Sequence, residues 1–500
     1  MKLSNANILA TAPGSLVLPA VIVAAAALAG TITAIAGSLA GSRAIYYVAV
    51  FSLIVAASVI AATRAEPSRF VFLALIAGFP IAAAAVPPTR FGFAVFHVVM
   101  LGLLVGLIMK KAFASSGAGA PLFPGNSLLI AWLLSIPCVV YSQFPLVSLL
   151  AYSMCFSIYV FFVFALDELR REGGFERLVF LLSTVLIIMA IGFFADHFLG
   201  VNLSLQESAL NQVTYLSGLQ ISRARGFFQD PLKGGAFLSC LITFLLVLSV
   251  RGRFHGRKLG FIVWAAIALG LGALVTTISR AAIVACLSVS AIAIFAFNKW
   301  SAAVKLLALG GMIAGVMIVA LMPTDLWINI IPATVGERFQ QMREEWENRP
   351  AIWFDTWNMF TDHPLTGIGF SSFRFFLIET RPTDFNYYGI GATEGVVYIP
   401  DQPESGYLKI LYEGGILGSI AVLLVAGGAI RRAISVIARS DPHSDARSES
   451  IAALAGLTTF GMTFVTLFTV SDPRIGAIFS FFLAVIWHRW LQSTQTTQKR

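Results

Sequence analysis

Charged residues are scarce in this sequence. Only 12% of its 500 residues are Asp, Glu, Lys or Arg, and 58% are hydrophobic, whereas soluble proteins carry roughly 25% charged residues. This composition excludes an ordinary soluble domain. The apolar runs are continuous and reach the length of about 20 residues that a helix needs to cross a bilayer, and they lack the alternation of membrane-barrel strands. The sequence therefore predicts an all-α, polytopic membrane protein.

Cysteine is also rare, and its placement gives no sign of disulfide or metal chemistry. The four cysteines lie inside apolar runs without a CxxC spacing, and no Cys/His pattern suggests a metal site. We expect buried free thiols and no bound metal or other cofactor. The cysteines are Cys138, Cys155, Cys240 and Cys286.

Acidic residues are outnumbered by basic ones, which gives a net charge of +9. The basic residues stand in short loops beside apolar runs, which is the pattern of cytoplasmic loops rather than of a nucleic-acid-binding surface. We expect 12–14 spans in a single polytopic domain over 1–500, with both termini cytoplasmic. The apolar run 16–36 is predicted to be the first span, not a signal peptide. The predicted spans are 16–37, 44–62, 69–86, 91–109, 127–142, 146–166, 177–198, 234–250, 259–276, 281–297, 302–322, 407–428, 451–470 and 475–491.

One long polar interruption, residues 323–406, divides the apolar spans and is predicted to be a large extracytoplasmic loop. Aromatic residues recur at helix-like spacing from Thr334 to Phe360, which predicts short helices inside the loop. Pro364 should end the last of these helices. Gly367 and Gly369 then favour a turn.

Arginines stand on the face that should be poor in them. Arg223 and Arg225 lie just before a span, and Arg280 lies between two apolar runs. A guanidinium presents a fork of donors that matches phosphate oxygens and keeps its charge. The alternatives are arginines that anchor the protein at the interface, or that extend their heads out of the membrane.

Carboxylates in and near the long loop are the candidate bases. Glu404 lies at the mouth of a span, where it could act as a general base or simply favour the start of a helix together with Ser405. Glu413 lies about two turns further on, at membrane depth, where it either supports the site or hydrogen-bonds a neighbouring helix. Asp362 and His363 form a possible catalytic pair, although they stand at a predicted helix end. Asp472 and Arg474, at another turn, are expected to pair with each other.

Four motifs occur in an order that resembles the O-antigen ligase and polymerase superfamily. They read RARGFFQDPLKGGAFLS, TTISRAAIVA, RPAIWFDTWNMFTDHPLTGIGFSSF and PESGYLKILYEGGILG, and they cover roughly residues 200–430. The ligase pattern His-Asn-x-Tyr-Leu, followed by Glu-x-Gly-x-x-Gly, is matched at Tyr407, Leu408, Glu413, Gly415 and Gly418. Glu404 and Ser405 replace its histidine and asparagine.

The resemblance implies a GT-C-like, inverting, metal-independent glycosyltransferase of the bacterial inner membrane, acting in exopolysaccharide or lipopolysaccharide synthesis. It implies that Arg223 or Arg225, together with Arg280, grips the pyrophosphate of an undecaprenyl-pyrophosphate-linked oligosaccharide. We assign Glu404 as the base that activates a glycan acceptor, with Tyr407, Glu413, Asp362 and His363 in supporting positions. Expected partners are the bilayer, a flippase and a chain-length regulator, with no nucleic acid.

Two other functions stay open at this stage. The replacement of the histidine favours a polymerase over a ligase that transfers glycan to a lipid A-core acceptor. A non-enzymatic transporter or flippase of lipid-linked sugars is the second alternative. Transporters tend to show internal repeats and polar groups at mid-membrane, whereas the candidate residues here gather at one predicted face.

Overall fold

The computed structural model describes part of the chain in detail, and the chain divides into two compact units, Met1–Pro124 and Gly125–Arg500. Helices α3 (Ala65–Ala77) and α4 (Phe79–Ala82) belong to the first unit. The helices and strands described from residue 126 onward belong to the second unit. The predicted spans 16–37, 44–62 and 302–322 lie outside the described residues. The described residues are 65–82, 96–97, 99–104, 126–200, 213–216, 219–228, 230–254, 258–297, 353–354, 356–373, 375–376, 405–466 and 472–498.

Long apolar helices make up nearly all of the second unit, which confirms the all-α polytopic membrane fold. Within the described residues, α8, α9, α10, α11, α17 and α19 are long and apolar enough to cross a membrane. The helices are α6 (Asn126–Leu134), α7 (Ile136–Val140), α8 (Pro145–Leu169), α9 (Gly174–Leu199), α10 (Pro231–Val250), α11 (Lys258–Thr276), α12 (Arg280–Phe297), α17 (Gly406–Arg439), α18 (Asp445–Thr463) and α19 (Pro473–Gln498).

Some predicted bounds differ from the observed ones for local reasons. The span predicted over 127–142 is broken at Ser135, because Pro137 stands in the first turn of α7 and cannot donate the hydrogen bond that would continue α6. The span predicted over 451–470 begins earlier, where the Ser444 side chain caps α18. The span predicted over 407–428 continues to Arg439 and is interrupted at Gly415.

One β-hairpin interrupts the helical fold in the loop before α10. Strands β1 (Val213–Leu216) and β2 (Leu219–Ser222) pair antiparallel, with Leu216 opposite Leu219. This hairpin was not predicted from the sequence.

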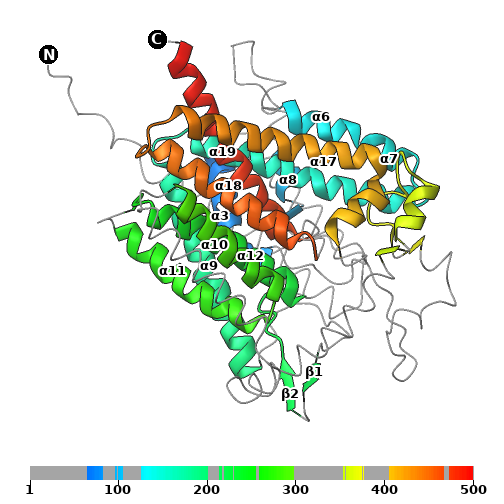
Figure 1. Ribbon diagram of the computed structural model, residues 1–500, viewed down its shortest axis with the longest axis horizontal. Helices are drawn as coiled ribbons and strands as arrows, with labels where there is room; N and C mark the ends of the chain where they lie inside the picture. The colour runs from blue at the N-terminus through cyan, green and yellow to red at the C-terminus, as the bar shows by residue number, and fades with distance from the viewer. Residues whose placement is uncertain are drawn as a thin grey trace. The chain divides into compact units, whose positions relative to one another are not determined.

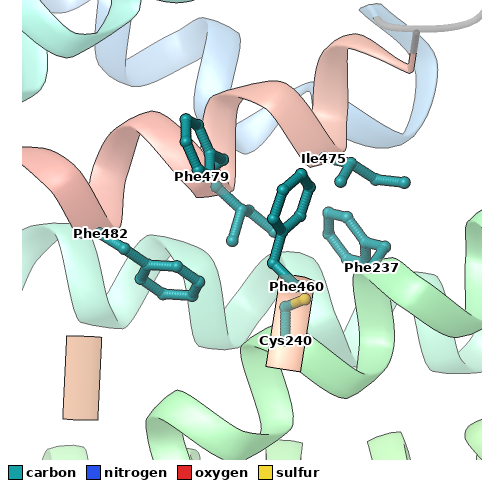
Figure 2. Close-up of a pocket in the computed structure, with 7 residues that line it drawn as sticks. Phe237, Cys240, Phe460, Ile475, Phe479 and Phe482 are labelled. Carbon is teal, nitrogen blue, oxygen red and sulfur yellow. The ribbon is translucent and has the colours of Figure 1, made fainter. Parts of the chain in front are cut away.

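Helix α10 lies at the centre of the bundle. It contacts α9, α11, α12, α18 and α19, and α17, α18 and α19 run beside one another (Figure 1). An apolar pocket between α10, α18 and α19 is lined by hydrophobic side chains alone, so it belongs to the packed core and offers no polar group for chemistry (Figure 2). Its lining residues are Phe237, Cys240, Phe460, Ile475, Ile478, Phe479 and Phe482.

Hydroxyl side chains fasten three of these helices to one another inside the bundle. Thr243 Oγ1 of α10 lies 3.2 Å from Thr459 Oγ1 of α18 and 3.4 Å from Ser290 Oγ of α12. Such hydrogen bonds between apolar helices contribute about 0.6 kcal/mol each on average. They fix the relative rotation of the helices whose ends carry the candidate site.

Candidate functional site

The segment 223–228, named here the arginine segment, connects the hairpin to the start of α10. Its backbone is held by the carboxylate of Asp196, near the end of α9. One oxygen, Asp196 Oδ2, accepts hydrogen bonds from the backbone N–H groups of Arg225 and Gly226. Asp196 is buried, and a buried carboxylate needs such donors to offset its lost hydration. The conformation of the arginine segment is therefore set by α9, whose Asp196 precedes Arg225 by 29 residues.

The arginine segment is also hydrogen-bonded to the turn between α11 and α12. Ala224 N donates to Thr276 O at 3.2 Å, and Arg223 Nε donates to Thr277 O at 3.4 Å. Arg280 is the first residue of α12, directly after this turn. The structure therefore joins the segment of Arg223 and Arg225 to the turn that carries Arg280.

The turn before Arg280 has an unusual backbone. Ile278 has a φ of 53°, which is a strained value for a β-branched residue. Ser279 is buried against α10, where a Cβ on Gly235 would lie 2.6 Å from the Ser279 Cβ. The absence of a side chain at Gly235 thus allows α10 to approach the start of α12.

Positive charge concentrates at this end of the bundle. The start of α12 exposes the positive end of its helix dipole, and Arg280 adds a full charge at the same point. Arg223, Arg225 and Arg280 are each half-buried. An anionic group that carries several oxygens, such as a phosphate or pyrophosphate, is the ligand that this combination suits.

Asp472 and Arg474 pair with each other, as the sequence predicts. Arg474 Nη2 lies 2.7 Å from Asp472 Oδ2, and both side chains are nearly buried. Arg474 does more than pair, however. Its Nη1 donates to Phe227 O at 2.8 Å, and its guanidinium carbon lies 3.7 Å from the centre of the Phe228 ring. Arg474 thus reaches the arginine segment from α19.

The start of α17 lies at the same end of the bundle. Gly406 N donates to Phe464 O at 2.8 Å, and Tyr407 Oη donates to Gly461 O at 2.9 Å. Both acceptors belong to the end of α18, whose Met462 lies beside Ser288 of α12. Phe460, near the end of α18, and Ile475, near the start of α19, line the same apolar pocket, and Arg474 of α19 contacts the arginine segment. The end of α18 therefore lies at the same end of the bundle as the arginine segment.

Glu404, the predicted base, lies outside the described residues. The next residue, Ser405, is buried and caps α17 by accepting from Leu408 N at 3.5 Å. This capping contact fits one of the two readings of the motif, in which the residues before the helix favour its start. The described residues locate the start of α17, and the role of Glu404 stays a prediction.

Glu413 binds a backbone segment inside the bundle. Its side chain is buried, and it accepts from Ser371 N at 2.8 Å and from Phe373 N at 3.2 Å. Lys409 Nζ lies 3.4 Å from Glu413 Oε1. Glu413 therefore holds the stretch that follows the helical residues 356–362, and its supporting role in the reaction stays a prediction.

Asp362 and His363 stand at the end of a short helical stretch, residues 356–362, as the proline rule predicts. Asp362 is exposed, and His363 Nε2 lies 3.0 Å from Gln143 Nε2 in the turn between α7 and α8. No carboxylate partner of His363 is found among the described contacts. The geometry shows a helix end that touches a neighbouring turn, and a catalytic role for this pair stays a prediction.

The backbone after His363 replaces the hydrogen bonds that α17 loses where its helix is interrupted. Gly415 has a φ of 59° and interrupts the helix. Ile416 N and Leu417 N donate instead to Pro364 O and Leu365 O, at 2.8 and 3.1 Å. Non-helical backbone is tolerated at membrane depth when protein groups satisfy it, and here the two irregular stretches satisfy each other.

Glycines make this close approach possible. A Cβ on Gly369, whose φ is 107°, would lie 1.8 Å from Ser142 Oγ. A Cβ on Gly415 would lie 2.5 Å from Leu365 O. The predicted Gly-x-Gly turn is confirmed, and its physical reason is contact with α17 and with the turn between α7 and α8.

Sequence reasoning missed three side chains that organise this end of the bundle. Asp196 was read as part of a span, although an ionised residue in an apolar run is a signal of function or pairing. Lys409 carries the same signal five residues after Glu404. The contact between Arg474 and the arginine segment has no local signal in the sequence, because its acceptor, the Phe227 carbonyl, is 247 residues away. Within the described residues, no group of three or more His, Cys, Asp and Glu side chains is arranged to hold a metal ion.

The fold defines a polytopic helical membrane protein, and the residue types at this end of the bundle make it the candidate site for an anionic ligand. Comparison with known families makes the class more specific. Residues 265–423 match the family model described as O-antigen ligase, in agreement with the resemblance to the O-antigen ligase superfamily. The match includes Arg280, the segment 362–373 and the first half of α17. No curated protein matches the chain.

Proposed function

We propose that the protein is a glycosyltransferase that extends glycan chains from lipid-linked oligosaccharide repeat units on the periplasmic face of the bacterial inner membrane. The family match supports a membrane ligase or polymerase. The donor is an oligosaccharide on undecaprenyl pyrophosphate, and the reaction inverts the anomeric centre without a metal ion. This proposal places the reaction in exopolysaccharide or O-antigen synthesis.

One observation carries the proposal. The arginine segment is hydrogen-bonded to the turn that leads into Arg280, so the two loops that carry the predicted pyrophosphate-binding arginines adjoin at one end of the bundle. A pyrophosphate is a larger and more highly charged anion than one arginine neutralises, and clustered guanidinium groups match its oxygens. The apolar helices at this end lie in the bilayer, in which the lipid tail of the donor can remain.

The reaction needs one proton acceptor and one stabilised leaving group. The acceptor hydroxyl gives its proton to the Glu404 carboxylate, and its oxygen forms a bond to the anomeric carbon. The bond from that carbon to the pyrophosphate oxygen breaks, and the electron pair leaves with the pyrophosphate. Arg223, Arg225 and Arg280 offset the negative charge that develops there, so orientation and charge neutralisation supply most of the rate enhancement.

Transfer to a lipid A-core acceptor is the second candidate. The description of the matched family as O-antigen ligase favours it. The presence of Glu404 and Ser405 in place of the ligase-type histidine and asparagine favours polymerisation. The two reactions share the donor and the leaving group and differ only in the acceptor.

Purified protein incubated with lipid-linked repeat units, without ATP or added metal, tests the proposal. Longer glycan is expected, together with release of undecaprenyl pyrophosphate. Unchanged glycan would contradict enzymatic function and favour transport. A parallel reaction with lipid A-core separates the candidates, since a ligase labels that acceptor and a polymerase extends the repeat units.

The base is tested separately by Glu404→Gln, which keeps the size of the side chain and removes its proton affinity. The expected loss of turnover is about 100- to 10,000-fold, the usual contribution of a general base. Polymer of wild-type length and yield from this variant would remove Glu404 from the mechanism. Asp401→Asn, three residues earlier in the same loop, is the matched control and should retain activity.

A further inference from the structure

Two buried charged side chains hold the arginine segment from different helices. Asp196, near the end of α9, is 7% exposed, and Arg474, at the start of α19, is 2% exposed. Asp196 accepts from the backbone of Arg225 and Gly226, and Arg474 donates to the backbone of Phe227. Three consecutive residues are thus fixed through their main chain by side chains nearly 280 residues apart in sequence.

We propose that Asp196 and Arg474 are positioning residues that hold Arg223 and Arg225 beside Arg280 before the donor binds; this inference rests on the proposed function. Neither residue needs to touch the donor. Asp196 acts through the backbone N–H groups of Arg225 and Gly226, to which it is hydrogen-bonded. Arg474 already forms an ion pair with Asp472 and a hydrogen bond with the Phe227 carbonyl, so its charge is compensated within the protein.

The packing around the two side chains supports a preformed site. A Cβ on Gly226 would lie 3.1 Å from the Phe193 ring, and Phe193 and Phe228 stack with ring centres 6.1 Å apart. Phe228 also lies under the Arg474 guanidinium. The arginine segment is therefore packed as closely as the core, although it belongs to a loop. A displacement of about 1 Å in such a segment is enough to lower turnover about 100-fold.

The chemistry of Asp196 allows a sharp pair of variants. A single oxygen accepts both of its backbone hydrogen bonds, so Asp196→Asn can keep both bonds while it loses the charge. Asp196→Ala loses both. We expect the Kd for undecaprenyl pyrophosphate to rise about 10- to 100-fold in Asp196→Ala, the range that follows from lost charge-assisted hydrogen bonds. Asp196→Asn should stay within about 3-fold of the wild type, because it keeps both hydrogen bonds.

Arg474→Ala is the second variant and should weaken the same binding about 10-fold, since it removes one hydrogen bond and the stacking on Phe228. The matched controls are Glu449→Ala and Arg253→Ala, which remove buried, ion-paired side chains of another part of the bundle. Their Kd per folded molecule should equal that of the wild type. A thermal unfolding midpoint and a monodisperse elution profile in detergent identify the folded fraction of every variant.

Hydrogen–deuterium exchange gives a readout that does not depend on activity. The amides of Arg225 and Gly226 should exchange faster in Asp196→Ala than in Asp196→Asn, while the amides of α10 stay protected. Folded Asp196→Ala and Arg474→Ala with wild-type Kd and wild-type exchange would overturn the positioning role and leave the proposed function intact. A wild-type protein that neither binds undecaprenyl pyrophosphate nor transfers glycan would overturn both.

Discussion

Helix α9 carries a carboxylate near each of its ends, and the two carboxylates bind different kinds of partner. Asp196 accepts from the backbone of the arginine segment. Glu176 accepts from the Arg253 side chain, with Nη2 and Oε1 2.6 Å apart. The two residues are separated by about 30 Å along the helix axis, at 1.5 Å per residue. The two ends of the bundle, of which these residues are part, differ in the same way.

The end that contains Glu176 holds an ion network, defined here as Glu176, Arg253, Asp445, Glu449 and Arg489. Glu449 is fully buried, and Arg489 lies 2.7 Å from it. Burial opposes the charge of Arg253, but Glu449, Asp445 and Glu176 outweigh that effect and raise its pKa. Three carboxylates and two guanidinium groups pair in this network, which joins α9, α18, α19 and the turn after α10.

At the arginine end, Asp196 and Arg474 hold the backbone of the arginine segment, which adjoins the turn before Arg280. Removing one member of a buried ion network costs stability, because it leaves its partner charge uncompensated, whereas arginines on adjoining loops suit an anionic ligand. The same helices therefore carry a structural end and a candidate functional end. The sequence predicts that the ion network faces the cytoplasm, and this orientation stays a prediction.

The largest effect is expected from Glu449→Ala. It leaves Arg253 and Arg489 without their shared buried partner, and breaking a buried pair costs about 3 to 5 kcal/mol. Chemical denaturation in detergent measures the loss in the free energy of unfolding. Activity per folded molecule should not change, and a loss of specific activity at full folding would contradict the division between the two ends.

Arg280→Ala should act in the opposite manner. We expect glycan formation to fall about 100-fold, as on removal of one electrostatic contact to a developing anion, with little change in the unfolding midpoint. Turnover with lipid-linked repeat units measures it. Arg253→Ala is the matched variant in the ion network and should lose stability rather than turnover. Unaffected turnover in Arg280→Ala would make Arg280 an interface anchor.

Glu413→Gln tests the contact between α17 and the backbone of residues 371–373. The amide cannot accept from both Ser371 N and Phe373 N in the same way, so one buried donor loses its partner at a cost of about 1 to 3 kcal/mol. The thermal midpoint and the rate of proteolysis between residues 362 and 373 measure the change. Thr458→Ala, which removes an exposed hydroxyl that bonds within its own helix, is the control. Equal midpoints would show that Glu413 does not hold this stretch.

The smallest effect is expected from Asp167→Asn. Its carboxylate lies 3.4 Å from Arg171 and is 62% exposed, and exposed pairs contribute about 1 kcal/mol or less. The adjacent Glu168 is nearly buried, with Arg177 Nε at 2.8 Å, so Glu168→Gln should cost more. Denaturation curves of the two variants rank them. A reversed order would show that burial does not decide the contribution of these ion pairs.

Much of the fold could be predicted from the sequence because hydrophobicity is a local property. An apolar run long enough to cross a bilayer has to be a helix, since its backbone groups can be satisfied only within the run. Six such helices are present in the described residues. Pro364 ended a helix as expected, and the glycines at 367 and 369 formed the expected turn. The O-antigen ligase resemblance was confirmed over residues 265–423.

The sequence by itself determined the class of protein and the residue types of the candidate site, because both depend on composition and on the order of short motifs. Only the tertiary structure decided that Asp196 and Arg474 hold the arginine segment, that Glu413 binds backbone, and that the break at Gly415 is satisfied by residues 364 and 365. These contacts join residues some 30 to 250 positions apart. No local pattern encodes such pairs, because each partner is chosen by how the helices pack.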